Sequence, residues 1–314
     1  MSLSLNQRTT KRWSVAEAVE GCVRHGLEAV GLWREEVAEQ GLAESVKLVR
    51  DAGLRVSSLC RGGFLTTPAD PAPGTSGRAS GGTARRAALD DNRRAIDEAA
   101  ELGAACLVMV VGGLPGVRPG EPLPGEPLPV VRPGEPLPAD PDGAGRPFSR
   151  DLAGAREQVA EALEVLAPYA GERGVKLALE PLHPMYCADR AVLSTLAQAV
   201  DLCLPYPEEQ VGVVVDTFHV WWDPRLFEEI ARAGRRIASY QVCDYLQPLP
   251  ADVLLGRGMM GDGVIDFPPI TRAVAAAGYT GDVEVEIFNA DVWAADPDEI
   301  VATMKHRYAR VVSV

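Results

Sequence analysis

The sequence lacks the features that mark several special classes of protein. No apolar run approaches the roughly 18 residues of a membrane-spanning helix, and residues 1–12 lack the basic-then-apolar order of a signal peptide. The six cysteines are scattered without a C-x-x-C pair, which argues against a zinc finger and against a disulfide scaffold. These absences predict a cytoplasmic protein that does not bind membranes.

Positive charge is also scarce. Lys and Arg number 31 against 44 Asp and Glu, which gives a formal net charge of −13. Because such a charge repels a phosphate backbone, we expect no nucleic-acid partner. The 314 residues, 46% hydrophobic and 24% charged, have the composition of an ordinary globular protein with a full core.

Short apolar runs alternate with helix-like stretches along nearly the whole chain. This alternation is typical of parallel βαβ units. The expected strands are residues 2–6, 28–33, 54–60, 105–112, 175–180, 211–216, 237–243 and 283–288. The expected helices are residues 14–25, 42–52, 83–102, 151–172, 190–203, 224–233, 268–277 and 297–310. Eight such pairs predict an α/β fold, a (β/α)₈ TIM barrel forming one domain over residues 1–314, with a doubly wound open sheet as the alternative.

One Pro/Gly-rich segment, residues 114–147, interrupts this alternation after the fourth strand. It contains VRPGEPLP at 117–124 and again at 131–138. Such a composition favours extended chain, so we interpret the segment as a surface insertion. It is either a tolerated expansion or a lid or partner-docking loop at the barrel mouth. A second stretch of this kind, residues 66–82, has the same interpretation.

Acidic residues lie at the ends of several late strands. Glu180 ends the fifth strand, Asp216 ends the sixth, and Glu286 lies near the end of the eighth. A single acid at a strand end is often a helix cap. However, the strand ends of a barrel converge on one mouth, and buried carboxylates need a partner or a cation. The group therefore predicts a divalent metal site.

Other positions at this mouth stay open between alternatives. The seventh strand offers Gln241 or Asp244, and spacing alone does not choose between them. In the eighth strand Glu284 and Glu286 can point to the same side, and we choose Glu286 because it is closer to the strand end.

Two histidines and several larger side chains complete the predicted site. His183 and His219 follow the acids Glu180 and Asp216 by three residues. Four residues are candidates for substrate contact, or else for packing and surface charge: Trp33, Arg61, Trp221 and Arg257.

Taken together, these residues resemble the xylose isomerase-like TIM barrels. This family includes sugar phosphate isomerases and epimerases, ketose 3-epimerases, inosose isomerases and dehydratases, and 3-dehydroshikimate dehydratases. The resemblance rests on LEPLHP at 179–184, VDTFH at 215–219, QVCDY at 241–245, GDGVID at 261–266 and EVEIF at 284–288.

The resemblance implies one divalent metal and a substrate contact from His219. The implied ligands are Glu180, Asp216, Gln241 and Glu286. The third ligand is commonly His in the epimerases, whereas Gln241 agrees with the dehydroshikimate dehydratases. A shell of oxygen ligands suits Mn²⁺ or Mg²⁺, with Co²⁺ or Zn²⁺ as alternatives.

We therefore expect a metal-dependent isomerase or epimerase of a ketose, sugar phosphate or keto-cyclitol that acts through an enediolate. Glu180 and Glu286 would remove and return the proton, and His219 and His183 would hold or protonate substrate oxygens. The alternatives are a dehydratase of the 3-dehydroshikimate or keto-inositol type, and a non-catalytic sugar-binding barrel. The expected partner is a small carbohydrate-like molecule, and a homodimer is the default assembly.

Overall fold

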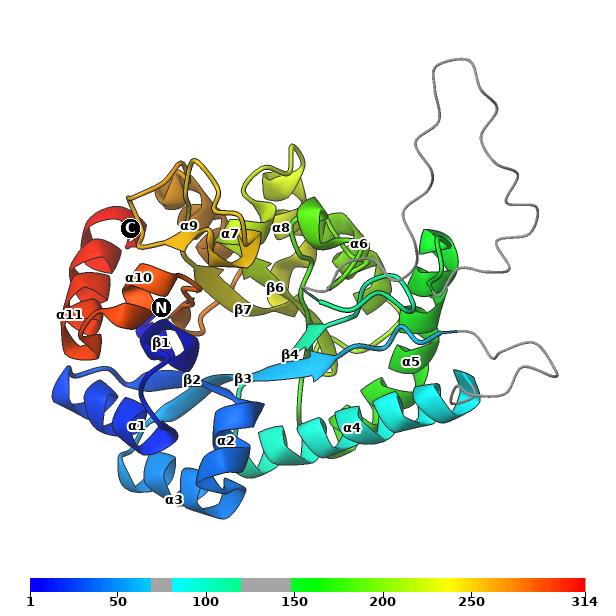
Figure 1. Cartoon of the computed structure of the whole chain (residues 1–314), viewed down its shortest axis with the longest axis horizontal. Coiled ribbons are helices and arrows are strands. Elements are labelled where there is room, and N and C mark those ends of the chain that lie inside the picture. Colours follow the sequence, from blue (N-terminus) through cyan, green and yellow to red (C-terminus); the bar gives the residue numbers. More distant parts are fainter. Residues whose placement is uncertain (69–80, 120–147, 314) are drawn as a thin grey trace.

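The computed structural model describes residues 1–68, 81–119 and 148–313 (Figure 1). The insertion expected at 114–147 lies outside these residues from position 120 onward. Most of the second Pro/Gly-rich stretch, positions 69–80, lies outside them as well. Within the described ranges no helix is both long and apolar enough to cross a membrane.

Eight parallel strands close into a barrel, so the predicted TIM-barrel fold is confirmed and the open sheet is wrong. The order around the barrel is β1-β10-β7-β6-β5-β4-β3-β2. The strands are β1 (Leu3–Asn6), β2 (Ala29–Trp33), β3 (Arg55–Gly63), β4 (Leu107–Val110), β5 (Leu177–Leu179), β6 (Val211–Asp216), β7 (Ile237–Val242) and β10 (Val283–Val285). Most of their residues are buried, because side chains fill the interior and helices cover the outside.

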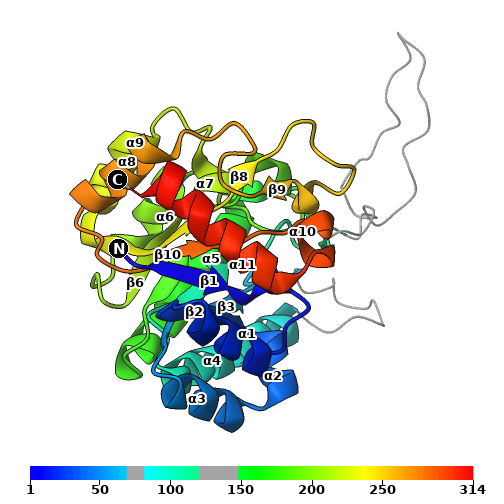
Figure 2. The same ribbon diagram turned by 90° about the vertical axis from the view of Figure 1, so that its left-hand side faces the viewer.

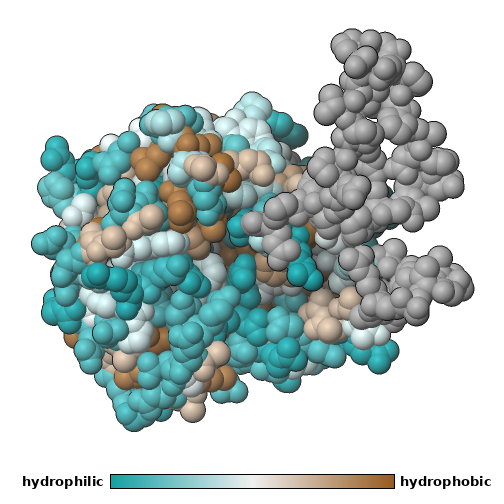
Figure 3. Space-filling view, viewed as in Figure 1, coloured by the Kyte–Doolittle hydropathy of each residue, from teal (hydrophilic) through white to brown (hydrophobic). Residues whose placement is uncertain are grey.

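Helices surround the barrel. They are α1 (Val15–Arg24), α2 (Arg34–Gln40), α3 (Leu42–Asp51), α4 (Gly81–Leu102), α5 (Leu152–Glu172), α6 (Leu196–Cys203), α7 (Thr217–Val220), α8 (Leu226–Ala233), α9 (Phe267–Ala276), α10 (Ala290–Ala294) and α11 (Pro297–Arg307). The last helix of this outer layer, α11, lies beside the first, α1 (Figure 2). Arg24 of α1 forms an ion pair with Asp298 of α11 at 2.8 Å. Hydrophilic residues cover most of the face in Figure 3, as expected for helices with one apolar side.

The fifth expected helix begins later than the sequence predicted. The pattern predicted residues 190–203, but α6 begins at Leu196, after the capping residue Thr195. The preceding residues run beside the end of β4 instead. The Gly112 N–H donates to the Arg190 carbonyl at 2.9 Å, and Gly112 also forms a parallel bridge with Ala191. This arrangement brings Arg190 to the barrel mouth.

Several short elements were not predicted. These are α2, α7, α10 and a small antiparallel sheet of β8 (Asp244–Tyr245) and β9 (Arg257–Gly258). They are too short to show a hydrophobic period, which is why the sequence pattern does not reveal them.

One charged side chain lies inside the barrel. Glu284 in β10 is fully buried and accepts hydrogen bonds from Asn6 Nδ2 at 2.6 Å and Ser57 Oγ at 2.5 Å. Ser58 Oγ lies 2.9 Å from both of its carboxylate oxygens. Gly31 in β2 leaves the room that this carboxylate needs, since a Cβ at that position would lie 2.6 Å from the Glu284 carboxyl carbon.

We expect Gly31→Ala to lower the free energy of unfolding by about 2 to 3 kcal/mol, because the added methyl group would press on the buried Glu284 carboxylate. Gly82→Ala in α4 is the matched control, since a Cβ there meets nothing within 4 Å. Chemical denaturation of both variants measures the difference. Equal effects of the two substitutions would show that the space beside Glu284 is not tightly filled.

Candidate active site

A cavity of about 260 Å³ opens at the carboxyl ends of the strands. Its lining includes six residues singled out from the sequence: Trp33, Arg61, Glu180, His219, Arg257 and Glu286. The other residues singled out, His183, Asp216, Trp221 and Gln241, are not part of the lining. Of the acids that the strand-end pattern singled out, Glu180 and Glu286 therefore line the cavity at the barrel mouth, whereas Asp216 does not.

Asp216, at the end of β6, has a different role for each of its oxygens. Oδ1 accepts the backbone N–H of Phe218 at 2.8 Å and thereby caps α7, as the helix-cap interpretation expects. Oδ2 accepts from Arg257 Nη1 at 3.0 Å. One carboxylate thus fixes the turn after β6 and still presents an oxygen to a cation.

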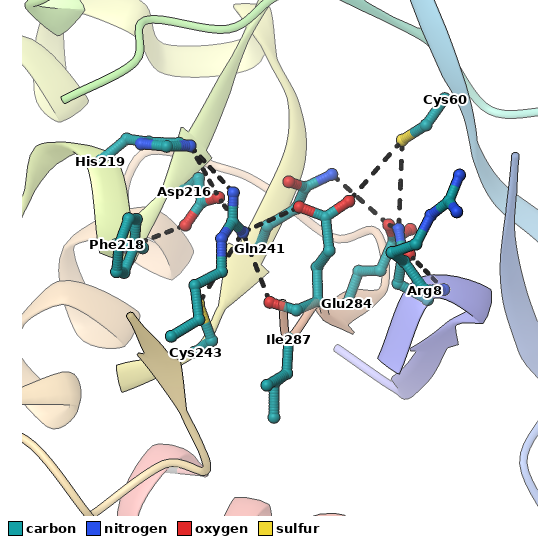
Figure 4. A network of polar contacts seen from close by, with 12 residues as sticks. Arg8, Cys60, Asp216, Phe218, His219, Gln241, Cys243, Glu284 and Ile287 are labelled. Carbon is teal, nitrogen blue, oxygen red and sulfur yellow. Dashed lines mark hydrogen bonds and ion pairs between the residues drawn. The ribbon is translucent and has the colours of Figure 1, made fainter. Parts of the chain in front are cut away.

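Arg257, from β9, supplies the cation that this structure places among the carboxylates. Its Nη1 also donates to Glu286 Oε2 at 2.8 Å. The guanidinium carbon lies 4.9 Å from the ring centroids of both Phe218 and Phe288, and only 4% of the side chain is exposed. A guanidinium between two carboxylates shows that this position accommodates positive charge (Figure 4).

A donor faces each ring nitrogen of His219. The backbone nitrogen of His183 lies 3.1 Å from Nδ1, and Arg257 Nη2 lies 3.0 Å from Nε2. Burial and then the charge of Arg257 lower the pKa of His219 well below its usual value, so the ring is neutral. A neutral imidazole accepts at one nitrogen and donates from the other, so the ring can accept from only one of these two donors.

The buried carboxylates exceed the positive charge that Arg257 provides. Burial, then the nearby Glu286 and Asp216, raise the pKa of Glu180 well above its ordinary value, and burial raises the pKa of Glu286 to about 7. Glu180, Asp216 and His219 each place one ligand atom within 4.8 Å of the others. A divalent cation would favour the ionised carboxylates, so this donor set fits such an ion.

The structure gives Glu284 and Glu286 different surroundings. Glu284 lies below the cavity, with both oxygens already hydrogen-bonded by Ser57 and Ser58, whereas Glu286 lines the cavity. Cys60 Sγ lies 4.0 Å from Glu286 Oε1, and Cys60, Glu284 and Glu286 each place one possible metal ligand within 4.8 Å of the others. The Glu284 oxygens, however, already accept hydrogen bonds from the serines. Glu286 is therefore the acid of this strand that can reach a ligand.

Gln241 and Asp244 also differ. Gln241 Nε2 lies 3.4 Å from Glu284 Oε1, and its Oε1 is buried without a donor among the described residues (Figure 4). Asp244 instead accepts the backbone N–H groups of Gly261 and Ile265 at 2.8 and 3.0 Å and so organises a loop. Of these two side chains, Gln241 has the oxygen that still lacks a partner.

His183 and Trp221 pack outside the cavity lining. His183 Nδ1 accepts the backbone N–H of Met185 at 3.3 Å, and its ring centroid lies 5.7 Å from those of Trp222 and Tyr245. The Trp221 ring lies 5.2 Å from the Tyr245 ring. In this arrangement His183 touches the site through its backbone N–H, which holds His219.

Sequence reasoning missed four polar residues of the lining: Arg8, Glu35, Tyr186 and Arg190. Arg8 lies two residues beyond the end of β1, so the strand-end argument used for the acids could have found it. Arg190 was assigned to a helix and was therefore not considered for the mouth. Tyr186 lies in a short turn that carries no sequence signal of its own.

Comparison with known proteins identifies relatives of this chain. The family described as Xylose isomerase-like TIM barrel matches residues 19–309. The inosose isomerase of Bacillus licheniformis is 27% identical over 165 residues, which are 51% of this chain and 56% of that protein. The 3-dehydroshikimate dehydratase of Pseudomonas aeruginosa is 31% identical over 153 residues, 46% of this chain and 23% of that protein. The chain thus matches about half of the first relative's length and less of the second.

Solved structures share the fold over nearly the whole chain. Protein SMc04130 from Sinorhizobium meliloti 1021 superimposes with a TM-score of 0.83 at 43% identity and covers 100% of this chain and 99% of its own. The IolI protein with a bound zinc atom superimposes with a TM-score of 0.73 at 20% identity, over 100% of this chain and 98% of its own. The second likeness shows the fold alone.

Replacing Arg257 tests its role as counter-charge in the metal-free protein. We expect Arg257→Met to lower the free energy of unfolding by about 3 kcal/mol near pH 8 in EDTA, because Asp216 and Glu286 lose their buried partner. Added Mn²⁺ should restore stability and should bind more tightly than to the wild type, since no guanidinium competes for the carboxylates. Thermal denaturation and calorimetric Mn²⁺ titration measure both effects. Arg235→Met, at an exposed position, is the control. Unchanged stability and Mn²⁺ affinity would contradict this role.

The raised pKa of Glu286 also predicts a pH dependence for the metal-free protein. Its pKa of about 7 in the folded state exceeds the ordinary 4.5, so between these values the folded state binds more protons than the unfolded state. Stability should therefore fall as pH rises through this window. Glu286→Gln should make the fall shallower, as measured by denaturation in EDTA at about pH 5 and about pH 7.5. An identical slope in the variant would assign the effect to other groups.

Proposed function

Because this chain belongs to the xylose isomerase-like TIM-barrel family, we propose that it is a divalent-metal-dependent isomerase or epimerase of a ketose, sugar phosphate or keto-cyclitol. The observation that carries the proposal is the convergence of Glu180, Asp216 and Glu286 on one buried centre beside a cavity of about 260 Å³. A cavity of this size admits a small molecule. The inosose isomerases among the relatives act on substrates of this kind, as their name states.

The cation would be held by oxygen atoms. The proposed ligands are Glu180, Asp216, Glu286 and the Gln241 Oε1 that lacks a donor among the described residues. A set made of carboxylate and amide oxygens favours Mn²⁺ or Mg²⁺ over Co²⁺ or Zn²⁺. When bound, the ion would supply the positive charge that stabilises an enediolate.

Glu180 and Glu286 are the proposed groups that move the proton. They directly follow β5 and β10, which β6 and β7 separate in the barrel, so they would approach a ligand from different sides. The pKa of Glu286 is raised to about 7 in the metal-free protein, and a bound cation would lower it and keep the carboxylate ionised, the form that accepts a proton. One carboxylate would take the proton from the carbon next to the carbonyl, and the other would deliver a proton to the enediolate carbon.

The remaining polar groups would position the substrate. The ring of His219 would hydrogen-bond a substrate oxygen, and His183 would act by orienting His219 through its backbone N–H. Arg257 would offer N–H groups to the same oxygens. Trp33 and Arg61 form part of the wall, whereas Trp221 would support the site from behind through Tyr245.

A dehydratase is the second candidate function. After the same proton abstraction, a dehydratase would expel a hydroxyl group as water and form a conjugated product. Gln241 favours this reaction, since the resemblance associates Gln at this position with the 3-dehydroshikimate dehydratases. One such dehydratase is 31% identical to this chain over 153 residues.

Proton NMR in deuterated water tests the proposed function. The Mn²⁺-loaded protein is incubated with ketoses, their phosphates, inososes and 3-dehydroshikimate, and we expect deuterium at a carbon next to the carbonyl of an interconverted sugar. Glu286→Gln should slow this exchange at least about 100-fold, because it removes a proton-transferring group. Glu228→Gln, on the exposed side of α8, is the control.

The outcomes of this experiment separate the candidates. Loss of water with new ultraviolet absorbance would replace the isomerase with the dehydratase. Full exchange in Glu286→Gln with metal bound would refute the role given to that residue. Binding of a sugar without exchange or turnover across the whole panel would favour the non-catalytic barrel.

A further inference from the structure

We propose that the substrate of this site carries an anionic group, a carboxylate or a phosphate, and that Arg190 binds this group at the cavity wall. The inference rests on the proposed function, since it names the substrate class that the same site would accept. It begins from the arginines that surround the cavity.

The lining includes four arginines: Arg8, Arg61, Arg190 and Arg257. This is a concentration of positive charge in a chain whose net charge is −13. Three of the four donate hydrogen bonds to carboxylates. Arg257 is paired with Asp216 and Glu286, Arg8 lies 2.9 Å from Glu36, and Arg61 lies 3.4 Å from Glu35.

Arg190 differs from the other three. Its guanidinium makes no hydrogen bond to any residue that the structure describes, and the carboxylate of Asp189 is 3.6 Å from its Nε. Only 18% of the side chain is exposed, and Nε is buried. Arg190 lines the cavity and its terminal N–H groups have no acceptor among the described residues, so a ligand in the cavity can supply one.

The backbone holds Arg190 in place. Its N–H donates to the Tyr186 carbonyl at 2.9 Å, and its own carbonyl accepts from Gly112 at 2.9 Å. The guanidinium carbon lies 5.7 Å from the Tyr186 ring centroid, and this ring lies 5.7 Å from that of His219. The Tyr186 ring thus lies between Arg190 and His219, so a group bound by Arg190 would be close to the proposed reacting centre.

The hydrogen-bonding geometry of the guanidinium indicates which class of ligand it would bind. Its planar array of N–H donors matches the paired oxygens of a carboxylate or phosphate, which a hydroxyl group cannot supply. A neutral polyol would leave the terminal N–H groups of Arg190 without paired oxygens, and Asp189, 3.6 Å from Nε, would remain its only charged partner among the described residues. The structure therefore points to an acidic cyclitol, an acidic sugar or a sugar phosphate.

Calorimetric binding to the Mn²⁺-loaded protein tests the inference with paired probes. Shikimate and myo-inositol are ring polyols with and without a carboxylate, and ribose 5-phosphate and ribose differ by a phosphate. We expect the charged member of at least one pair to bind about 10- to 100-fold more tightly. The pair that shows this preference identifies the anionic group. Equal affinities within both pairs would overturn the inference.

Substitutions assign the preference to Arg190. Arg190→Gln should remove it, whereas Arg190→Lys should keep part of it through the remaining charge. Arg235→Gln removes the same charge at a position that is 78% exposed and should leave the preference intact. A preference that persists in Arg190→Gln would exclude this residue as its source. The binding experiment does not depend on turnover, so the two proposals can fail separately. Tighter binding of charged ligands without deuterium exchange in any substrate would refute only the proposed function. Turnover of neutral substrates, with equal affinity for charged and neutral ligands, would refute only this inference.

Discussion

The site depends on one electrostatic constraint, the burial of several carboxylates at the same end of a barrel. Glu180, Asp216 and Glu286 are each at most 5% exposed, so their ionised forms need positive charge close by. In this structure Arg257 partly meets that need, because its guanidinium joins Asp216 and Glu286. The neutral state of His219 and the raised pKa of Glu286 follow from the same crowding and burial.

A second polar layer supports this centre from inside the barrel. Glu284 is held by Asn6 and two serines of β3, and Gly31 leaves room for it. Asn6 in turn accepts from Trp33 Nε1 at 2.9 Å, so the same network fixes a wall of the cavity. The amide nitrogen of Gln241 faces the Glu284 carboxyl oxygen that also accepts from Asn6, and this leaves the Gln241 oxygen available.

The loops after the strands carry other polar groups that line the cavity. A turn capped by Asp216 carries His219, and the small sheet of β8 and β9 carries Arg257 across the mouth. The segment before α6 is joined to the end of β4 and places Arg190 on the wall. The strands therefore supply the proposed proton chemistry, while the loops supply the charge that would distinguish one substrate from another. This division is usual in TIM barrels, where the strands are rigid and the loops vary.

The sequence alone determined the eight strand and helix pairs and the acids at the ends of strands, because burial and periodicity are local properties of the chain. Closure into a barrel then required Glu180, Asp216 and Glu286 to converge. Only the tertiary structure decided which groups pair there. Arg257 meets Asp216 and Glu286 across 41 and 29 residues of chain, and no local pattern records such a contact. The environments of Gln241 and Asp244, and the place of Arg190 in a stretch that resembled a helix, likewise depend on neighbours that only the folded barrel brings together.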